Sequence, residues 1–340
     1  MRALEKTRRW VGVCMFVLGP SLGCATHSAP NSKPVINDFE PPQMVAERPS
    51  PPQDPNRVAL GRLLFHDPRL SRSREVSCNS CHALTRFGID GRATSGRPWE
   101  HGGARNVPTV LNAATHVAQY WDGRALTVEA QASDAMTNPV EMAMPDEAAV
   151  VDAVSRVPRY VEMFHKAFPS DDKPISIHNV GESIGAFERG LVTRSRWDLF
   201  MAGDHTVLTP RERKGLNLFM QRGCIVCHAG PQVGGTSLQK VGVVVPWPNQ
   251  LDTGRFEVTH FVPDRMVFKV PSLKNIAETG PYFHDGSTTS LENAIRLMAL
   301  HQLGIEIIGD EVEAIADWMR SMTGQPDPGY FTAPELPPGG

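Results

Sequence analysis

The chain has 340 residues, of which 41% are hydrophobic and 21% are charged, and its formal net charge is −3 at pH 7. This balance is typical of a globular protein and excludes a disordered or fibrous chain. The length is sufficient for two domains that each bury a core. No stretch dense in Lys and Arg occurs, which argues against a nucleic-acid-binding protein, whereas a basic protein partner stays open.

The first 24 residues are interpreted as an export signal. Four Lys and Arg residues lie among the first nine, and the apolar stretch 10–22 that follows is short for a permanent membrane span. The stretch ends in Ser21-Leu22-Gly23-Cys24, which resembles the lipobox of bacterial lipoproteins, although Ser21 stands where Leu is usual. The segment predicts a periplasmic protein, either lipid-anchored through Cys24 or cleaved nearby without a lipid. Residues 25–55 are rich in proline and predict an extended linker.

The four cysteines outside the export segment form two Cys-X-X-Cys pairs, each followed directly by His. Such a motif supplies two thiols for thioether bonds to haem vinyl groups and an imidazole for the iron. A zinc knuckle or a redox disulfide is the alternative, but neither requires a His after each pair. The sequence therefore predicts two covalently attached c-type haems, with His82 and His228 as iron ligands. The two motifs consist of Cys78, Cys81, His82, Cys224, Cys227 and His228.

Each motif follows a short amphipathic helix signal. Asp54 before Pro55 predicts a helix start, and the run Thr209-Pro210-Arg211-Glu212 predicts a second start with a capping box. Further helices are predicted over 146–157, 178–191, 290–298 and 310–322, and no stretch alternates well enough to predict a strand. We therefore expect an all-α fold of two cytochrome c-like domains with long ordered loops. The expected domains span residues 56–200 and 201–332, followed by a tail, 333–340.

Eight segments of the chain carry a resemblance to a known family. They are ALGRLLFHDPRLS (59–71), CNSCH (78–82), RNVPTVLNA (105–113), YWDGRA (120–125), NPVEM (138–142), CIVCH (224–228), FKVPSLKNIAETGPYFHDGS (268–287) and IRLMALHQLG (295–304). With these segments the sequence resembles the bacterial di-haem cytochrome c peroxidases and their MauG-like relatives, from about Val58 to Thr323. The resemblance implies that the N-terminal haem reacts with peroxide and that the C-terminal haem receives electrons.

The same resemblance implies roles for individual residues. Met298 corresponds to the axial ligand that raises the potential of the C-terminal haem. Glu141 corresponds to the carboxylate that moves a proton between the two peroxide oxygens, and Gln131 to an amide that orients peroxide. Trp121 corresponds to a tryptophan between the haems. By residue type alone, Met298 and Trp121 are equally compatible with core packing, and Glu141 and Gln131 with an exposed face.

Two further features follow from the resemblance. Asn106, with the backbone carbonyls of Thr279 and Pro281, corresponds to a Ca²⁺ site built from oxygen ligands. At the place of the removable distal His of the peroxidatic haem this sequence has Pro98, which cannot bind iron. Either His101 takes over as the removable sixth ligand, or the iron is open in the resting state and needs no reductive activation. The stiffness of proline favours the open form.

The resemblance implies reduction of hydrogen peroxide to water, with electrons from a small periplasmic cytochrome c or cupredoxin, by a homodimer. One alternative is a di-haem electron carrier without catalysis, which the presence of Glu141 argues against. The other is a MauG-like oxidase that acts on a partner protein, which is associated with a Tyr at the position of Met298. The residues do not identify the physiological donor, and no dimer surface can be located by inspection.

Overall fold

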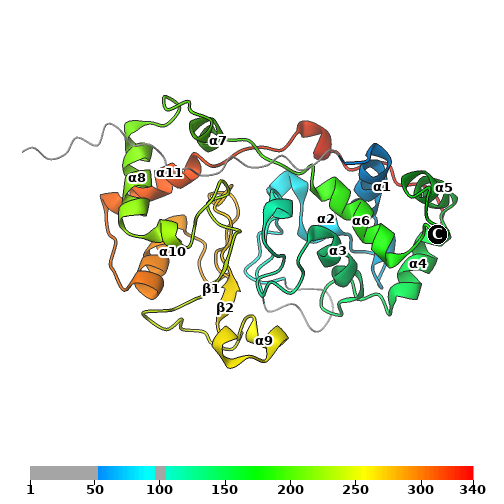
Figure 1. The fold of residues 1–340 in the computed structure, drawn as a ribbon, viewed down its shortest axis with the longest axis horizontal. Helices are drawn as coiled ribbons and strands as arrows, with labels where there is room; N and C mark the ends of the chain where they lie inside the picture. The colour runs from blue at the N-terminus through cyan, green and yellow to red at the C-terminus, as the bar shows by residue number, and fades with distance from the viewer. Residues whose placement is uncertain (1–52, 96–104, 340) are drawn as a thin grey trace, which may run out of the picture. The chain divides into compact units, whose positions relative to one another are not determined.

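The computed structural model describes residues 53–95 and 105–339 (Figure 1). The predicted export signal with Cys24, most of the linker, Pro98 and His101 lie outside the described residues. The α-helices of the described chain are α1 Pro55–His66, α2 Cys78–Cys81, α3 Val128–Thr137, α4 Glu147–Ser155, α5 Pro158–Ala167, α6 Ile177–Glu188, α7 Arg196–Met201, α8 Pro210–Gln221, α9 Phe256–Thr259, α10 Leu291–Met298 and α11 Asp310–Arg320.

Short helical turns complete the helical part of the described residues. They are the 3-10 helices η1 Pro68–Leu70, η2 Leu84–Arg86, η3 Ala113–Thr115, η4 Cys224–Val226, η5 Val262–Asp264 and η7 Pro328–Tyr330, and the π-helix η6 Ala299–Leu303. The predicted helices over 146–157, 178–191, 290–298 and 310–322 are confirmed as α4, α6, α10 and α11. Five α-helices of the described chain, α2, α3, α5, α7 and α9, were not predicted.

Both predicted helix starts are confirmed. The Asp54 carboxylate accepts the backbone N–H of Asn56 at 2.7 Å, at the beginning of α1. Thr209 and Glu212 form the predicted capping box at the beginning of α8. These caps satisfy backbone N–H groups that have no partner within the helix, which is why helices begin at these residues.

The expectation that no strand is present was wrong. Two three-residue strands, β1 Leu238–Lys240 and β2 Val267–Lys269, pair antiparallel with Leu238 opposite Lys269. Three residues are too few to show an alternating pattern, and the pairing joins segments far apart in the sequence. The fold is therefore mostly helical, with one small two-stranded sheet.

The crossing of α1 and α6 depends on a glycine. A Cβ atom on Gly61 would lie 1.7 Å from the backbone oxygen of Ser183, so any side chain there would force the helices apart. One turn further along α1, Phe65 packs on Phe187 of α6 with 5.3 Å between ring centroids. Helices α3 and α5 pack on the same pair, and the core of this group is continuous.

The crossing of α8 and α11 repeats this arrangement. A Cβ atom on Gly215 would lie 1.9 Å from the backbone oxygen of Ala314. One turn later, Phe219 packs on Trp318 of α11 at 4.7 Å between centroids. The segments GRLLF (61–65) and GLNLF (215–219) thus each supply a glycine at a helix crossing and a phenylalanine that packs one turn later. Each segment lies in a helix that precedes a Cys-X-X-Cys-His motif.

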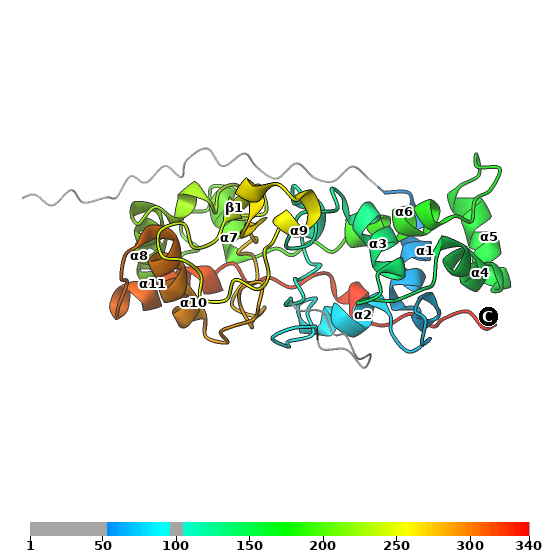
Figure 2. The same ribbon diagram turned by 90° about the horizontal axis from the view of Figure 1, so that it is seen from below.

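The last described residues return to the first group of helices. The Arg62 guanidinium of α1 donates hydrogen bonds to the carbonyls of Gly329 and Thr332, and Tyr330 packs on Phe187. Figure 2 shows this segment, in red, running towards α1. None of the helices in residues 53–95 and 105–339 combines the length and apolarity needed to cross a membrane.

The Gly215→Ala substitution should destabilise the protein by about 1–3 kcal/mol, because the added methyl group overpacks the α8–α11 crossing. Chemical denaturation followed by circular dichroism would measure the change. Gln221→Ala, at an exposed position of the same helix, is the matched control and should change the stability by less than about 0.5 kcal/mol. Equal stability of the Gly215→Ala variant and the wild type would contradict the close crossing.

Candidate active site

One cavity of about 740 Å³ is lined by both Cys-X-X-Cys-His motifs. Cys78 is the one motif residue outside its wall, and it lies one helical turn from Cys81 in α2. The cavity therefore brings together two groups of residues that are far apart in the sequence. Its wall includes all the other predicted site residues within the described chain, which are Cys81, His82, Asn106, Trp121, Gln131, Glu141, Cys224, Cys227, His228, Thr279, Pro281 and Met298.

In the N-terminal motif, the two cysteines begin and end the single turn of α2. Ser77 caps this turn through a capping box with Ser80. The backbone N–H of His82 bonds to the Cys78 carbonyl at 2.9 Å, which places the imidazole directly after the turn. The Nδ1 atom of His82 lies 3.3 Å from the Gly88 carbonyl oxygen. A carbonyl at this place fixes the ring orientation, as is usual for an imidazole that binds a metal through Nε2.

The C-terminal motif has the same local geometry. Cys224 begins η4, and the Nδ1 atom of His228 lies 3.3 Å from the Val233 carbonyl oxygen. Burial lowers the pKa of His228 to about 4, although hydrogen bonds to backbone carbonyls act in the opposite direction. The ring is therefore neutral near pH 7, which is the form that binds metals.

The cysteine pairs are arranged neither as disulfides nor as a zinc site. In the described chain, no disulfide joins Cys78 to Cys81 or Cys224 to Cys227. Within residues 53–95 and 105–339, no three His, Cys, Asp or Glu side chains gather as they would around a metal ion. The thiols, the oriented imidazoles and the cavity between them fit two covalently attached haems, for which such motifs supply thioether bonds and one axial ligand each.

Met298 is the last residue of α10 and is followed by the π-helix η6. A π-turn changes the helical phase of the side chains around it, and such turns are frequent at functional sites. Met298 lines the cavity together with His228. The structure thus brings a thioether and the C-terminal imidazole into the same cavity.

Glu141 is held by two donors. Its Oε1 atom accepts a hydrogen bond from the Asn138 amide at 2.7 Å and one from the Arg124 guanidinium at 3.2 Å. The Arg124 guanidinium also lies over the Tyr120 ring, 3.3 Å from its centroid. Gln131 lies on α3, and its amide nitrogen is 3.5 Å from the Tyr120 hydroxyl. Glu141 and Gln131 are therefore joined through Tyr120 and Arg124 on one wall of the cavity.

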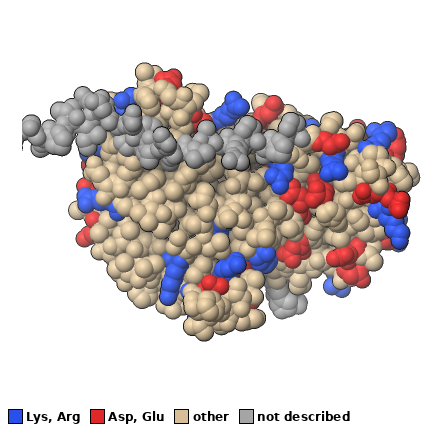
Figure 3. Space-filling view, viewed as in Figure 1, with Lys and Arg blue, Asp and Glu red and all other residues tan. Residues whose placement is uncertain are grey.

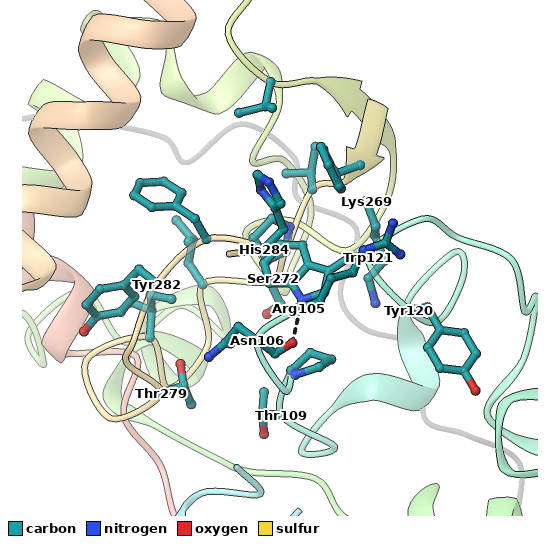
Figure 4. A pocket seen from close by; sticks show the side chains of 18 of the residues that line it. Arg105, Asn106, Thr109, Tyr120, Trp121, Lys269, Ser272, Thr279, Tyr282 and His284 are labelled. Carbon is teal, nitrogen blue, oxygen red and sulfur yellow. Dashed lines mark hydrogen bonds between the residues drawn. The ribbon is translucent and has the colours of Figure 1, made fainter. Parts of the chain in front are cut away.

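Trp121 is fixed at both its side chain and its backbone. Its indole N–H donates to the Asn106 carbonyl at 2.9 Å, which is the dashed line in Figure 4. Its own carbonyl accepts the Lys269 backbone N–H at 2.7 Å. The indole packs against a small cluster that contains Trp247 and Phe268. It lies in the wall of the cavity that both haem motifs share.

The three predicted calcium ligands line the same cavity. The Asn106 side-chain amide nitrogen donates to the Arg92 carbonyl at 2.8 Å, and the Asn106 backbone N–H donates to the His284 carbonyl at 2.7 Å. Thr279 and Pro281 lie on the loop before α10. Figure 4 shows Asn106 and Thr279 near each other in the pocket.

Comparison with known proteins identifies the family. The sequence profile described as di-haem cytochrome c peroxidase matches residues 55–206. Cytochrome c551 peroxidase of Nitrosomonas europaea is 45% identical over 291 residues, which cover 84% of this chain and 85% of the relative. Cytochrome c551 peroxidase of Pseudomonas aeruginosa is 41% identical over 294 residues, with 84% of each chain covered. The chain belongs to the di-haem cytochrome c peroxidase family.

The fold agrees with this membership. A solved MauG-like protein associated with microbial copper homeostasis superposes with a TM-score of 0.74 and 26% identity, covering 87% of this chain and 99% of that protein. Membership in the family implies two haems, and the two motifs in one cavity are consistent with that number.

Several charged residues that line the cavity had no role predicted from the sequence. Arg105 and Asp122 lie within or beside the quoted segments RNVPTVLNA and YWDGRA, and Lys269 lies in FKVPSLKNIAETGPYFHDGS. Glu188 of α6 is buried, and burial, followed by the charge of Glu129, raises its pKa to about 8. Arg105, Asp122 and Lys269 lie in the quoted segments and Glu188 does not, and the burial and partners of all four depend on the fold.

Arg105 joins segments that are far apart in the sequence. Its guanidinium bonds to both oxygens of Asp252, at 2.6 and 2.7 Å, and to the carboxylate of Asp122. All three side chains are mostly buried. Burial tends to raise the pKa of Asp252, but the hydrogen bonds from Arg105 outweigh it and lower that pKa below its ordinary value.

The Arg105→Gln substitution should destabilise the protein by about 3 kcal/mol at pH 7, because it leaves the buried Asp252 carboxylate without its cation and Asp122 with Arg124 alone. The lowered pKa of Asp252 means that its stabilising effect is complete above about pH 4 and is lost as the pH falls through the folded-state value. The difference in the free energy of unfolding between variant and wild type should therefore become smaller below about pH 4. Chemical denaturation at a series of pH values measures this difference.

The control is Arg156→Gln, which breaks an exposed pair with Asp152 and should cost less than about 1 kcal/mol at any pH. A pH-independent difference for Arg105→Gln would contradict the assignment of the effect to the carboxylates.

Proposed function

We propose that this chain is a di-haem cytochrome c peroxidase that reduces hydrogen peroxide to water with electrons from a small periplasmic cytochrome c or cupredoxin. The observation that carries the proposal is the single cavity lined by both Cys-X-X-Cys-His motifs together with Glu141, Gln131 and Trp121. The names of the relatives from Nitrosomonas europaea and Pseudomonas aeruginosa support it.

His82 and His228 would each hold one haem iron through Nε2, and the four motif cysteines would form the thioether bonds. The sulfur of Met298 would be the second axial ligand of the C-terminal haem iron. Thioether ligation favours the reduced state of that iron. When bound, the haems supply the redox equivalents that split the O–O bond of peroxide. The N-terminal domain over 56–200 would be peroxidatic, and the C-terminal domain over 201–332 would receive electrons.

Glu141 would move the proton that O–O cleavage requires. The carboxylate would take a proton from one peroxide oxygen and deliver it to the other, which would leave as water. The hydrogen bonds from Asn138 and Arg124 keep the carboxylate in one orientation for both steps. The Gln131 amide would hold peroxide by hydrogen bonds from α3.

Trp121 would fill the space between the two haem sites. A large indole excludes water and provides a polarisable path for electrons. Its hydrogen bond to Asn106 links this path to the proposed Ca²⁺ site, for which Asn106 and the carbonyls of Thr279 and Pro281 would be ligands. Oxygen donors with some backbone carbonyls suit this hard cation.

Exposed apolar side chains of the C-terminal half suit a redox partner. They are Val226, within the motif, Val243, Leu300 and Ile308. Figure 3 shows few charged side chains over the part of the face in view that carries α10, and many over α4 to α6. An apolar docking surface permits rapid exchange of a small electron donor. A periplasmic location, a lipid on Cys24 and a homodimer are parts of the same proposal.

The proposal is tested by steady-state peroxide reduction with reduced cytochrome c, measured with and without prior half-reduction. Turnover without half-reduction corresponds to the open resting site expected from Pro98, whereas turnover only after it corresponds to a removable ligand such as His101. No turnover under either condition would contradict the peroxidase function and favour a di-haem electron carrier without catalysis.

The Glu141→Gln variant should lose peroxide turnover by a factor of about 10²–10⁴, because an amide cannot carry the proton. The haem content and the spectrum of the C-terminal haem should stay those of the wild type. Glu147→Gln, at an exposed position in the first turn of α4, is the matched control and should keep full turnover. Near-normal turnover of Glu141→Gln would remove Glu141 from its assigned role.

The Met298→His variant should lower the midpoint potential of the C-terminal haem, because imidazole favours ferric iron more than a thioether does. A potentiometric titration followed by absorbance measures both haems. Met319→Leu, which changes another methionine of the cavity wall, is the control and should leave both potentials in place. An unchanged potential of the C-terminal haem in Met298→His would mean that another residue is the axial ligand of its iron.

A further inference from the structure

Lys269 is a buried cation in the wall of the cavity. It ends β2, the residue is only 6% exposed, and its position is labelled in Figure 4. In the described chain, its ammonium group has one hydrogen-bonding partner, the Nδ1 atom of His116 at 3.4 Å. Burial lowers the pKa of Lys269 to about 8, against the opposing effect of the Asp122 charge. A buried ammonium with one neutral partner carries an unsatisfied charge.

His116 offers a second unsatisfied donor. Burial, and then the charge of Lys269, lowers the pKa of its ring to about 3, so the imidazole is neutral. Because Nδ1 accepts from the Lys269 ammonium, the ring proton is on Nε2. The Nε2 atom is buried and has no hydrogen-bond partner among the residues described. The backbone of Gly235 lies against this edge of the ring.

The carboxylate of Asp122, whose charge acts on Lys269, has no hydrogen bond to either donor. Asp122 accepts hydrogen bonds from the guanidinium groups of Arg105 and Arg124. Its effect on Lys269 is only that of a nearby charge. Lys269 and His116 both line the cavity, so its wall carries one positive charge supported by a neutral imidazole. A carboxylate is the complement of that charge.

We infer that Lys269 and His116 form a binding site for a propionate carboxylate of the haem attached at Cys224 and Cys227. This inference rests on the proposed function only in requiring that the haem is attached there. The segments that carry both residues lie against the C-terminal motif. The carbonyl of Pro271, two residues after Lys269, bonds to the His228 ring, and His116 contacts Gly235 in the loop that follows the motif.

The test uses the haem-loaded full-length protein and the Lys269→Gln variant. Loss of the ammonium leaves the propionate charge uncompensated, which stabilises ferric iron. The ratio of oxidised to reduced C-terminal haem at a fixed potential should rise about tenfold, a lowering of about 59 mV for one electron. Potentiometric titration gives this shift, and pyridine haemochrome analysis shows that two haems are retained. Unchanged potentials of both haems, or a shift of the N-terminal haem alone, would overturn the inference.

Two variants control for charge and for structure. Lys269→Arg keeps the cation and can bond to a carboxylate through two N–H groups, so the potential should stay within a few-fold of the wild-type ratio. Lys214→Gln removes the same charge from α8, outside the cavity wall, where the side chain is 51% exposed. It should shift the potential much less, because water screens the charge. Equal shifts for Lys214→Gln and Lys269→Gln would mean that the effect comes from net charge alone and would overturn the inference.

If Lys269→Gln fails to take up haem, a crystal structure of the haem-loaded wild type tests the inference instead. A propionate oxygen within about 3.2 Å of the Lys269 ammonium is expected, and a propionate directed to solvent would overturn the inference. Both measurements are independent of peroxide turnover. A chain that carries two haems but lacks peroxidase activity would refute the proposed function and leave this site to be judged on its own result.

Discussion

The site depends on the close crossing of two helices at a glycine. This crossing occurs in two helix pairs of the chain, α1 with α6 and α8 with α11. Gly61 lets α1 approach the backbone of α6, and Gly215 lets α8 approach the backbone of α11. The motif turns then contact the first helix of each pair, α2 on α1 and η4 on α8. Because each crossing fixes the helix that holds a motif, the positions of the two iron-binding imidazoles follow from the packing of the two helix pairs.

The charged residues of the cavity wall are largely paired with one another. Arg105 connects Asp122 with Asp252, and Arg124 connects Asp122 with Glu141. Paired charges of this kind contribute a field that acts on a redox centre in the cavity. Against this background a buried ammonium held only by a neutral ring is an exception, and its proposed partner is an anion brought by the cofactor.

The parts of the structure that depend on neighbouring residues were predictable. Asp54 and the run from Thr209 to Glu212 marked helix starts correctly, because capping involves groups three residues apart. The strands were missed because Leu238 pairs with Lys269, far away in the sequence, and neither short segment has a pattern that predicts this pairing. For Met298 and Glu141, the composition of the chain was uninformative and the family resemblance supplied the hypothesis. The burial of Lys269 was not predictable, since the surrounding residues come from several distant segments.

Trp121 connects the parts of the cavity mechanically. Its indole N–H is bonded to Asn106, and its carbonyl is bonded to the backbone of Lys269 at the end of β2. Asn106 is in turn bonded to the loop that carries His284, through its own backbone N–H. A displacement of the segment around Asn106 must therefore break one of these bonds or move the indole and β2 together. A cation bound at Asn106 would hold that segment in place, and so would set the position of the aromatic ring through which we propose that electrons pass.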